Sequence, residues 1–278
     1  MQGEYRTTAQ LREHYEIEKE LAAKLRNASR EERCHLYTSL YNELFQKVPS
    51  HPQLAQKSSP RQAATAVASQ IKFLGRFLNK ESTFLEVGSG DCALSLEAAK
   101  RVKQVYAVDV CDEITKGLTQ PRNFQLILSD GCGIPVPRGS VDVAYSNQLM
   151  EHLHPDDAFE QLQNIYNALS PGGIYICLTP NRLGGPHDIS RYFDRVATGF
   201  HMKEYTISEI NILLKKVGFS KIDAYVGARG TFLRAPLWSL CTFEALLDKI
   251  PYSLGVKIAR SPPVRLLLGI RLVAIKLL

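Results

Sequence analysis

The N-terminal part of the chain carries apolar residues three and four positions apart, the period of an amphipathic helix. This spacing predicts two helices within residues 9–47. Ser29 followed by Glu32 forms a capping-box pattern, which places the start of the second helix. Residues 50–60 are rich in Pro, Ser, Gln and Lys and are predicted to be a linker. A further helical segment is expected near residues 63–78, before the core of the fold.

From Thr83 onward, short apolar runs alternate with segments long enough for a helix. Such alternation predicts repeated βα units and a mostly parallel sheet. The predicted strands cover residues 84–87, 105–108, 124–128, 141–145, 174–178, 222–226 and 270–277. Thr206 and Glu209 form a second capping-box pattern, which opens a helix that runs to Gly218. The pattern therefore predicts a single α/β core with helical additions.

The composition is that of an ordinary globular protein, since 45% of the 278 residues are hydrophobic and 22% are charged. No stretch reaches the roughly 18 uninterrupted apolar residues that are typical of a membrane-spanning helix. The cysteines are scattered, without a CxxC pair or a Cys/His cluster at zinc-ligand spacing. They are Cys34, Cys92, Cys111, Cys132, Cys177 and Cys241. We therefore expect a cytoplasmic protein with reduced thiols.

The formal net charge of +6 is concentrated at the C-terminal end of the chain. From Tyr225 onward, eight Lys and Arg residues face two acidic residues, Glu244 and Asp248. Residues 1–224 are therefore neutral overall, which argues against a general nucleic-acid-binding surface. The basic C-terminal segment is instead expected to contact an anion.

The segment from Phe84 to Ala93 is predicted to be a strand that runs into a glycine turn and then a helix. Gly88 can adopt backbone angles that a Cβ would penalise, and Gly90 lets the chain approach a ligand beside the helix start. With Ala93 they match G-x-G-x-x-[GA], and Asp109 follows Gly88 by 21 residues at the end of the next strand. An acid there can accept hydrogen bonds from ribose hydroxyls. The alternative is a tight βα turn without a ligand.

Three further features favour a bound ligand over an empty turn, and the first of them favours S-adenosylmethionine (SAM) over NAD. Glu86 precedes the first glycine, where it would repel phosphates but suits an amino group and a sulfonium. Asp130 and Gly131 end the third strand, where a carboxylate can accept a hydrogen bond from an adenine amine. A Pro-Gly-Gly turn at residues 171–173 leads into the fifth strand.

These motifs resemble those of class I SAM-dependent methyltransferases, in particular the bacterial type 11 small-molecule group. The matching pieces come in the family's order and span about residues 83–230. They are Glu86 to Gly90, Val108-Asp109, Ser129 to Gly131, Val141 to Val143, Met150 to Leu153 and Ser170 to Gly173. Gly269 to Lys276 is similar to the family's last antiparallel strand. Residues 1–60 and about 232–268 are not covered.

The resemblance implies a Rossmann-like seven-stranded sheet in the order 3-2-1-4-5-7-6, with strand 7 antiparallel. It also implies that Glu86, Gly88 and Gly90 surround the methionine part of SAM. Asp109 would bind the ribose and Asp130 the adenine, while Asn147 would lie near the reacting centre. Ser89, Val110 and Gly131 complete the implied cofactor-binding set.

Three histidines are candidates for a general base that would assist transfer to a hydroxyl. His152 lies after the fourth strand, at the carboxyl edge where open α/β sheets bind ligands. His187, beside Asp188, falls in the long loop 180–204, which we expect to contact the acceptor. His201 lies in the same loop. The alternative for each is a structural residue, such as a helix-start histidine bonded to backbone.

No metal is expected, because the fourth strand ends in Ser146-Asn147 rather than in an acidic cluster. Motifs of the nucleic-acid base methyltransferases, Asn-Pro-Pro-Tyr and Pro-Cys, are also missing from the sequence. We expect a helical extension at residues 1–60 and a SAM-binding domain at 61–278. A helical insertion at 232–268 would be core, a lid, or a basic amphipathic surface that contacts a membrane or a lipid-linked substrate.

The sequence thus predicts a methyltransferase that moves a methyl group from SAM to a small organic acceptor, such as a hydroxyl of a natural product or saccharide. Two alternatives stay open. One is a catalytically silent SAM-binding partner or regulator, and the other is an NAD-dependent oxidoreductase that uses the same glycine turn.

Overall fold

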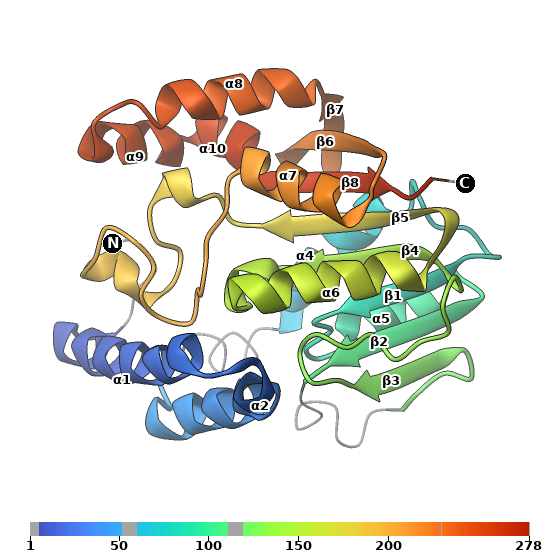
Figure 1. The fold of residues 1–278 in the computed structure, drawn as a ribbon, viewed down its shortest axis with the longest axis horizontal. Helices are drawn as coiled ribbons and strands as arrows, with labels where there is room; N and C mark the ends of the chain where they lie inside the picture. Colours follow the sequence, from blue (N-terminus) through green and yellow to red (C-terminus); the bar gives the residue numbers. More distant parts are fainter. Residues whose placement is uncertain (1–5, 52–59, 111–118, 229, 278) are drawn as a thin grey trace.

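The computed structural model describes residues 6–51, 60–110, 119–228 and 230–277, with side chains from residue 63 onward in the second range. A single mixed sheet forms its centre, with helices on both faces (Figure 1). The described strands are β1 (Thr83–Val87), β2 (Gln104–Asp109), β3 (Phe124–Leu128), β4 (Val141–Asn147), β5 (Leu169–Thr179), β6 (Lys221–Ala228), β7 (Thr231–Ala235) and β8 (Ile270–Ile275).

Helices are present at residues 8–47 and near residues 63–78, where the apolar spacing predicts them. The described helices are α1 (Thr8–Asn27), α2 (Arg30–Lys47), α4 (Pro60–Leu74), α5 (Ala93–Ala99), α6 (Pro155–Ala168), α7 (Ile207–Val217), α8 (Leu237–Leu247), α9 (Tyr252–Arg260) and α10 (Pro262–Leu268), with short 3-10 turns η1 (Met150–His152), η2 (Arg182–Gly184) and η3 (Ile189–Tyr192). Both predicted capping boxes are present, at Ser29 with Glu32 and at Thr206 with Glu209. Gly218 ends α7 in the left-handed conformation, as predicted.

The described part of the sheet has eight strands in the order β3-β2-β1-β4-β5-β8-β6-β7. The strands from β3 to β5 are parallel, and β8 is antiparallel to both β5 and β6. The prediction of seven strands was therefore one short. The additional strand, β7, pairs with β6 as an antiparallel hairpin at the edge of the sheet. Its five residues include only one buried apolar side chain, Phe232, so the pattern gave no alternation to identify it.

Two apolar layers hold the helices on the sheet. On one face, α6, α7 and the two N-terminal helices pack against alternate residues of the strands, among them Leu85, Val87 and Val108. On the other face, α4 and α5 pack against Phe84 and Tyr145. The parallel strands point toward the side of the molecule that carries α1, α2 and the loop of residues 180–204 (Figure 1). That edge is where a ligand site of an open α/β sheet is expected.

The helix α2 is anchored to α6 through a buried ion pair. Arg33 donates two hydrogen bonds to the Asp157 carboxylate, at 2.7 and 2.6 Å, and both side chains are almost completely buried. The Tyr37 hydroxyl donates a third, at 2.7 Å. This anchor places α2 over Gly131, where an added Cβ would lie 2.8 Å from Tyr37 Cδ2. The N-terminal helices are thus part of the wall of the carboxyl edge.

Among the described residues, no helix combines the length and the apolar character needed to cross a bilayer. The five cysteines in that part of the chain are free thiols, and Cys111 lies outside the described residues.

Candidate active site

The glycine turn has the geometry that the sequence predicts, with β1 running through it into α5. Gly88 and Gly90 have φ angles of +74° and +52°, a region that side chains with a Cβ disfavour. The Gly88 amide donates to the Val108 carbonyl at 2.8 Å. A Cβ on Gly88 would also lie 3.1 Å from Leu149 Cδ1. The turn therefore places backbone atoms without side chains at the carboxyl edge of the sheet, between β1 and β4.

Asp109 holds this turn with its carboxylate at the end of β2. Oδ2 accepts a hydrogen bond from the Gly90 amide at 2.7 Å, and Oδ1 accepts one from the Val110 amide at 2.8 Å. The Val110 carbonyl in turn accepts from Thr38 Oγ1 of α2 at 2.7 Å. The side chain is half-buried at the mouth of the turn. Asp109 therefore supports the backbone of Gly90 and Val110 with its two carboxylate oxygens.

Glu86 is a buried carboxyl group directly before the turn. It is 7% exposed, and its Oε2 accepts a hydrogen bond from Ser95 Oγ at 2.5 Å. Burial raises the pKa of Glu86 to about 8, and the neighbouring Asp91 and Asp109 charges act in the same direction. A cationic ligand beside it would favour the ionised form. A positive group beside Glu86 and the ionised form of its carboxyl group would therefore stabilise each other.

Asp130 is held by its own turn and by α2. Its Oδ1 accepts from the amides of Cys132 and Gly133 at 3.0 and 2.7 Å. Its Oδ2 lies 3.3 Å from Arg30 Nη2. Although burial opposes the charge, these amides and Arg30 lower the pKa of Asp130 to about 2. The carboxylate is ionised, and Gly131 beside it lies under Tyr37, so α2 covers this end of the site.

Asn147 and Gln148 lie at the end of β4, between two cavities. Gln148 adopts a φ of +55°, and its amide donates to the Leu178 carbonyl at 2.9 Å. Asn147 lines a cavity of about 350 Å³ beside Arg271 and α10, and Gln148 lines that cavity and the next one. Sequence reasoning identified Asn147 and missed Gln148, although both follow the same strand.

The three predicted histidines meet in a cavity of about 400 Å³. His152 lies at the end of η1, and the rings of His152 and His201 are edge to face, with centroids 4.7 Å apart. His187 is exposed and its Nε2 donates to the Asn181 carbonyl at 2.9 Å. Asp188 does not orient it, because the Asp188 carboxylate accepts from the amides of Ser190 and Gly199 instead.

The hydrogen bonds of His152 and His201 fix one nitrogen of each ring. Nδ1 of His152 lies 2.7 Å from the Tyr41 hydroxyl and 3.2 Å from the Phe200 carbonyl. Nδ1 of His201 lies 2.6 Å from a carboxylate oxygen of Glu204. Burial lowers the pKa of His152 to about 3, and His201 adds to the effect. Burial also opposes charge on His201, but Glu204 and Glu151 outweigh it and raise the pKa of that ring.

The N-terminal helices contribute side chains to this cavity that sequence reasoning missed. They are Arg6, His14, Glu18, Tyr41, Leu44 and His51. His14 Nε2 lies 2.7 Å from Glu18 Oε2, and Glu18 Oε1 accepts from the Phe200 amide at 2.9 Å. One signal was available, because His14 and Glu18 interrupt the apolar stripe of α1 between Leu11 and Leu21.

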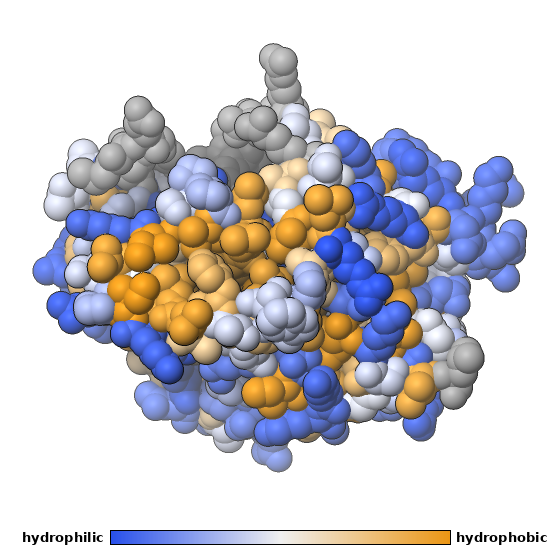
Figure 2. Space-filling view, turned by 90° about the horizontal axis from the view of Figure 1, so that it is seen from above, coloured by the Kyte–Doolittle hydropathy of each residue, from blue (hydrophilic) through white to orange (hydrophobic). Residues whose placement is uncertain are grey.

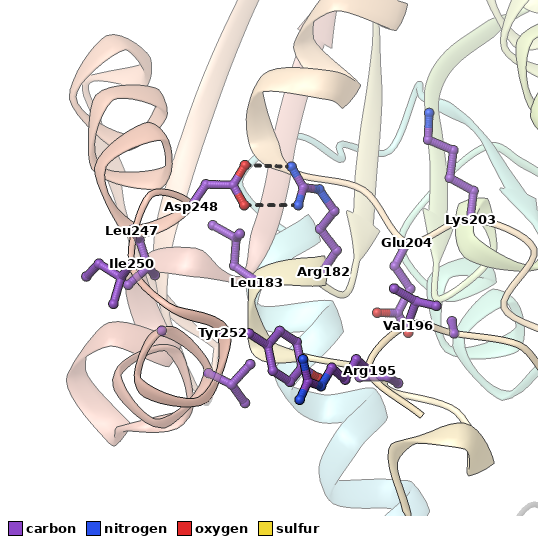
Figure 3. A pocket seen from close by; sticks show the side chains of 14 residues that line it. Arg182, Leu183, Arg195, Val196, Lys203, Glu204, Leu247, Asp248, Ile250 and Tyr252 are labelled. Atoms are coloured by element: carbon purple, nitrogen blue, oxygen red, sulfur yellow. Dashed lines mark hydrogen bonds and ion pairs between the residues drawn. The ribbon is translucent and has the colours of Figure 1, made fainter. Parts of the chain in front are cut away.

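A separate cavity of about 490 Å³ lies between the 180–204 loop and helices α8 and α9. Arg182 donates to both oxygens of Asp248 at 3.1 Å across its upper edge (Figure 3). Its lining combines the basic side chains Arg182, Arg195 and Lys203 with the apolar side chains Leu183, Val196, Leu247, Ile250 and Val256. Glu204 lines it as well, so one carboxylate contacts both this cavity and His201.

Comparison with known proteins agrees with this geometry. Residues 85–177 match a family described as a methyltransferase domain. A probable S-adenosylmethionine-dependent methyltransferase of Mycolicibacterium smegmatis is 30% identical over 141 residues, which are 50% of this chain and 52% of that protein. The chain thus matches about half the length of this curated relative.

Two solved structures share the fold. The 1,6-didemethyltoxoflavin-N1-methyltransferase of Burkholderia thailandensis gives a TM-score of 0.55 at 18% identity, covering 87% of this chain and 90% of that one. A SAM-dependent methyltransferase from Archaeoglobus fulgidus gives 0.51 at 17% identity, covering 79% and 96%. The overall fold of this chain is therefore of the same type as theirs. In this chain, β8 lies between β5 and β6 and is antiparallel to both, as the sequence resemblance implied for the last strand.

Proposed function

We propose that this chain transfers a methyl group from SAM to a small organic acceptor. The match of residues 85–177 to a methyltransferase-domain family and the similarity to a probable S-adenosylmethionine-dependent methyltransferase support the proposal. The observation that carries this proposal is the buried Glu86 beside the open Gly88–Gly90 turn. A carboxyl group in that place stabilises the ammonium and sulfonium of SAM and opposes a pyrophosphate.

The cofactor would lie along the carboxyl edge of β1, β2 and β3. Asp109 would accept hydrogen bonds from the ribose, and Val110 would border the ribose. Asp130, with Gly131, would face the adenine. Ser89 belongs to the turn around the methionine part, and Asn147 would border the methyl group. Transfer from a sulfonium is an in-line displacement, so the protein's main task is to hold the acceptor oxygen close to the methyl carbon.

The polar cavity of His152, His187 and His201 supports a hydroxyl-bearing acceptor such as a natural product or saccharide. Its lining includes histidine, tyrosine and carboxylate side chains that can donate or accept hydrogen bonds, and it also includes Gln148 at the end of β4. The free thiols of the described cysteines support a reducing, cytoplasmic setting.

Thermal unfolding with candidate ligands tests the cofactor assignment. A ligand at a hundred times its Kd stabilises a protein by about 2.7 kcal/mol, which corresponds to roughly 5–10 °C in Tm at this chain length. We expect SAM and S-adenosylhomocysteine to raise the Tm and NAD to leave it unchanged. A rise with NAD alone would identify an oxidoreductase. Binding of SAM without methyl transfer to any hydroxyl acceptor in a screened extract would identify a silent SAM-binding partner.

We also propose that helices α8–α10 contact an anionic membrane surface. Seen from the side on which these helices lie, apolar side chains cover a broad area with hydrophilic ones beside it (Figure 2). Leu233, Trp238, Leu246 and Leu254 are 52–74% exposed there. Exposed apolar and basic side chains on one helical face are typical of peripheral membrane contact. The position of the patch near the cavity of Figure 3 suits an acceptor attached to lipid.

Vesicle sedimentation tests this contact. We expect the protein to bind vesicles that contain phosphatidylglycerol, and to bind vesicles of phosphatidylcholine alone more weakly. Trp238→Ala removes an aromatic side chain that is 74% exposed and is expected to weaken binding about ten-fold, a loss of about 1.4 kcal/mol. Leu128→Ala, on the exposed face of β3 at the far end of the sheet, is the control. Equal losses in the two variants, or no sedimentation with either vesicle, would contradict the proposal.

A further inference from the structure

A glutamate and two histidines come together at the base of the histidine cavity. Glu151 and His152 are adjacent on η1, and His201 comes from the 180–204 loop. One potential ligand atom of each lies within 4.8 Å of those of the other two. Glu151 and His201 are buried, whereas His152 is half-buried and lines the cavity. The donor set is two imidazole nitrogens and one carboxylate oxygen.

Glu151 carries an oxygen that the protein leaves without a hydrogen bond. The side chain is 0% exposed, and its Oε2 accepts from Thr179 Oγ1 at 2.8 Å. Its Oε1 has no hydrogen-bond partner among the described residues. A buried carboxylate oxygen without a partner is costly, and a bound cation is one way in which proteins compensate for it.

The two histidine rings are held as metal-ligating rings usually are. Nδ1 of His152 contacts both the Tyr41 hydroxyl and the Phe200 carbonyl, and a proton on Nδ1 lets this nitrogen donate to the carbonyl. Nδ1 of His201 donates to the Glu204 carboxylate. In each ring, Nε2 is therefore the nitrogen that remains available to bind a metal ion. A backbone carbonyl and a carboxylate are the outer partners that fix the tautomer and orientation of imidazole ligands.

We propose that Glu151, His152 and His201 bind one divalent transition-metal ion. Two imidazoles and a carboxylate suit Zn²⁺ or Mn²⁺ better than Mg²⁺ or Ca²⁺, which prefer all-oxygen ligands. The sequence analysis expected no metal because it looked for acids at the end of β4. The carboxylate instead lies on η1 beside His152, and the third ligand, His201, comes from a distant loop.

The remaining coordination positions would face the cavity, where an acceptor oxygen can bind. This use of the ion rests on the proposed methyl transfer. The ion would lower the pKa of the bound hydroxyl, and the proton would leave through the cavity to solvent. The oxygen–methyl bond would form as the sulfur–methyl bond breaks, and neutral S-adenosylhomocysteine would leave.

A neighbouring group, His14 with Glu18 and His51, also has donor atoms within 4.8 Å of one another. There, however, Arg6 Nη1 lies 2.7 Å from His14 Nδ1, and both Glu18 oxygens accept hydrogen bonds. A guanidinium at that distance opposes a second cation. We therefore assign the ion to Glu151, His152 and His201.

Metal binding to the full chain tests the proposal without SAM. Protein treated with a chelator would be titrated calorimetrically with Zn²⁺, Mn²⁺ and Mg²⁺, with stoichiometry measured by elemental analysis after dialysis. We expect one Zn²⁺ or Mn²⁺ per chain and much weaker binding of Mg²⁺. Glu151→Gln keeps the size of the side chain and is expected to weaken binding at least ten-fold. Binding of Co²⁺ gives a second readout, because its visible absorption reports loss of a ligand.

Two control variants separate this site from other histidines. His154→Gln changes the histidine that caps α6, and His51→Gln changes the neighbouring group, so both are expected to keep wild-type affinity. Circular dichroism and Tm verify that each variant folds. Failure of the ions to bind wild-type protein at 1 mM, or unchanged affinity in a folded Glu151→Gln variant, would overturn the proposal. Because SAM is absent, these outcomes are independent of whether the protein is a methyltransferase.

Discussion

Replacing Asp109 with alanine is expected to raise the Kd for SAM at least about 100-fold. The variant loses the carboxylate that would bind the ribose and also the acceptor of the Gly90 and Val110 amides. A hydrogen bond to a charged group contributes about 1.5–3 kcal/mol. The loss of two such bonds between the carboxylate and the ribose would therefore account for a 100-fold rise in Kd. Isothermal titration calorimetry with S-adenosylhomocysteine measures it without turnover.

Two variants show whether cofactor binding depends on the Asp109 carboxylate itself or only on negative charge in this part of the protein. Asp109→Asn keeps one oxygen acceptor and is expected to bind more weakly than wild type but better than Asp109→Ala. Asp156→Ala removes a carboxylate that is 82% exposed at the start of α6 and should leave the Kd unchanged. Wild-type affinity in a folded Asp109→Ala variant would remove Asp109 from the cofactor site.

Replacing Arg33 with alanine is expected to lower the free energy of unfolding by about 3–5 kcal/mol, because Asp157 would remain buried without its partner. This corresponds to a decrease of roughly 6–20 °C in Tm. Arg33 and Asp157 have side chains that are 5% and 0% exposed, so solvent cannot replace the missing partner. Urea unfolding at neutral pH measures the loss.

The same pair gives the protein a pH-dependent stability with a defined sign. Burial opposes the charge on Asp157, but Arg33 and Tyr37 outweigh it and lower the pKa of the carboxyl group. The pair therefore stabilises the fold above the pKa that Asp157 has when unfolded, and this stabilisation is lost as the pH falls through the folded pKa. Arg33→Ala should remove that part of the acid dependence.

A double substitution tests whether the stability lost in Arg33→Ala comes from leaving one buried charge without its partner. Arg33→Met with Asp157→Leu removes both charges and is expected to recover most of the stability lost in Arg33→Ala. Arg101→Ala, at an exposed ion pair with Glu97, is the matched control and should change the free energy of unfolding by less than about 1 kcal/mol. An Arg33→Ala variant as stable as the control would show that α2 does not depend on this anchor.

The strands, the capped helices and the glycine turn were predictable because their signals are local. Alternating apolar runs identified seven of the described strands, and the Ser29 and Thr206 capping boxes located two helix starts. The turn at Gly88 was predictable for the same reason, since a strand, two glycines and a helix follow one another directly. Its geometry needed no information from distant residues.

The rest of the site depends on contacts between distant segments. The meeting of Glu151 and His201 requires the path of the 180–204 loop, and no periodicity encodes that path. Likewise, the periodicity of α1 and α2 shows which face is buried but not which partner it meets. Tyr41 beside His152 and Arg30 beside Asp130 are consequences of that docking. The strand β7 was missed because five residues at a sheet edge bury too little to leave a pattern.

The fit of Tyr37 over Gly131 has a consequence for how this protein can evolve and be engineered. Gly131 has a φ of +92° and no room for a Cβ beneath the tyrosine ring, and the same tyrosine is bonded to the carboxylate that Arg33 neutralises. The N-terminal helices are therefore not an interchangeable module. A chimera that grafts them onto another core must transfer positions 33, 37, 131 and 157 together, and natural variation at these four positions should be correlated.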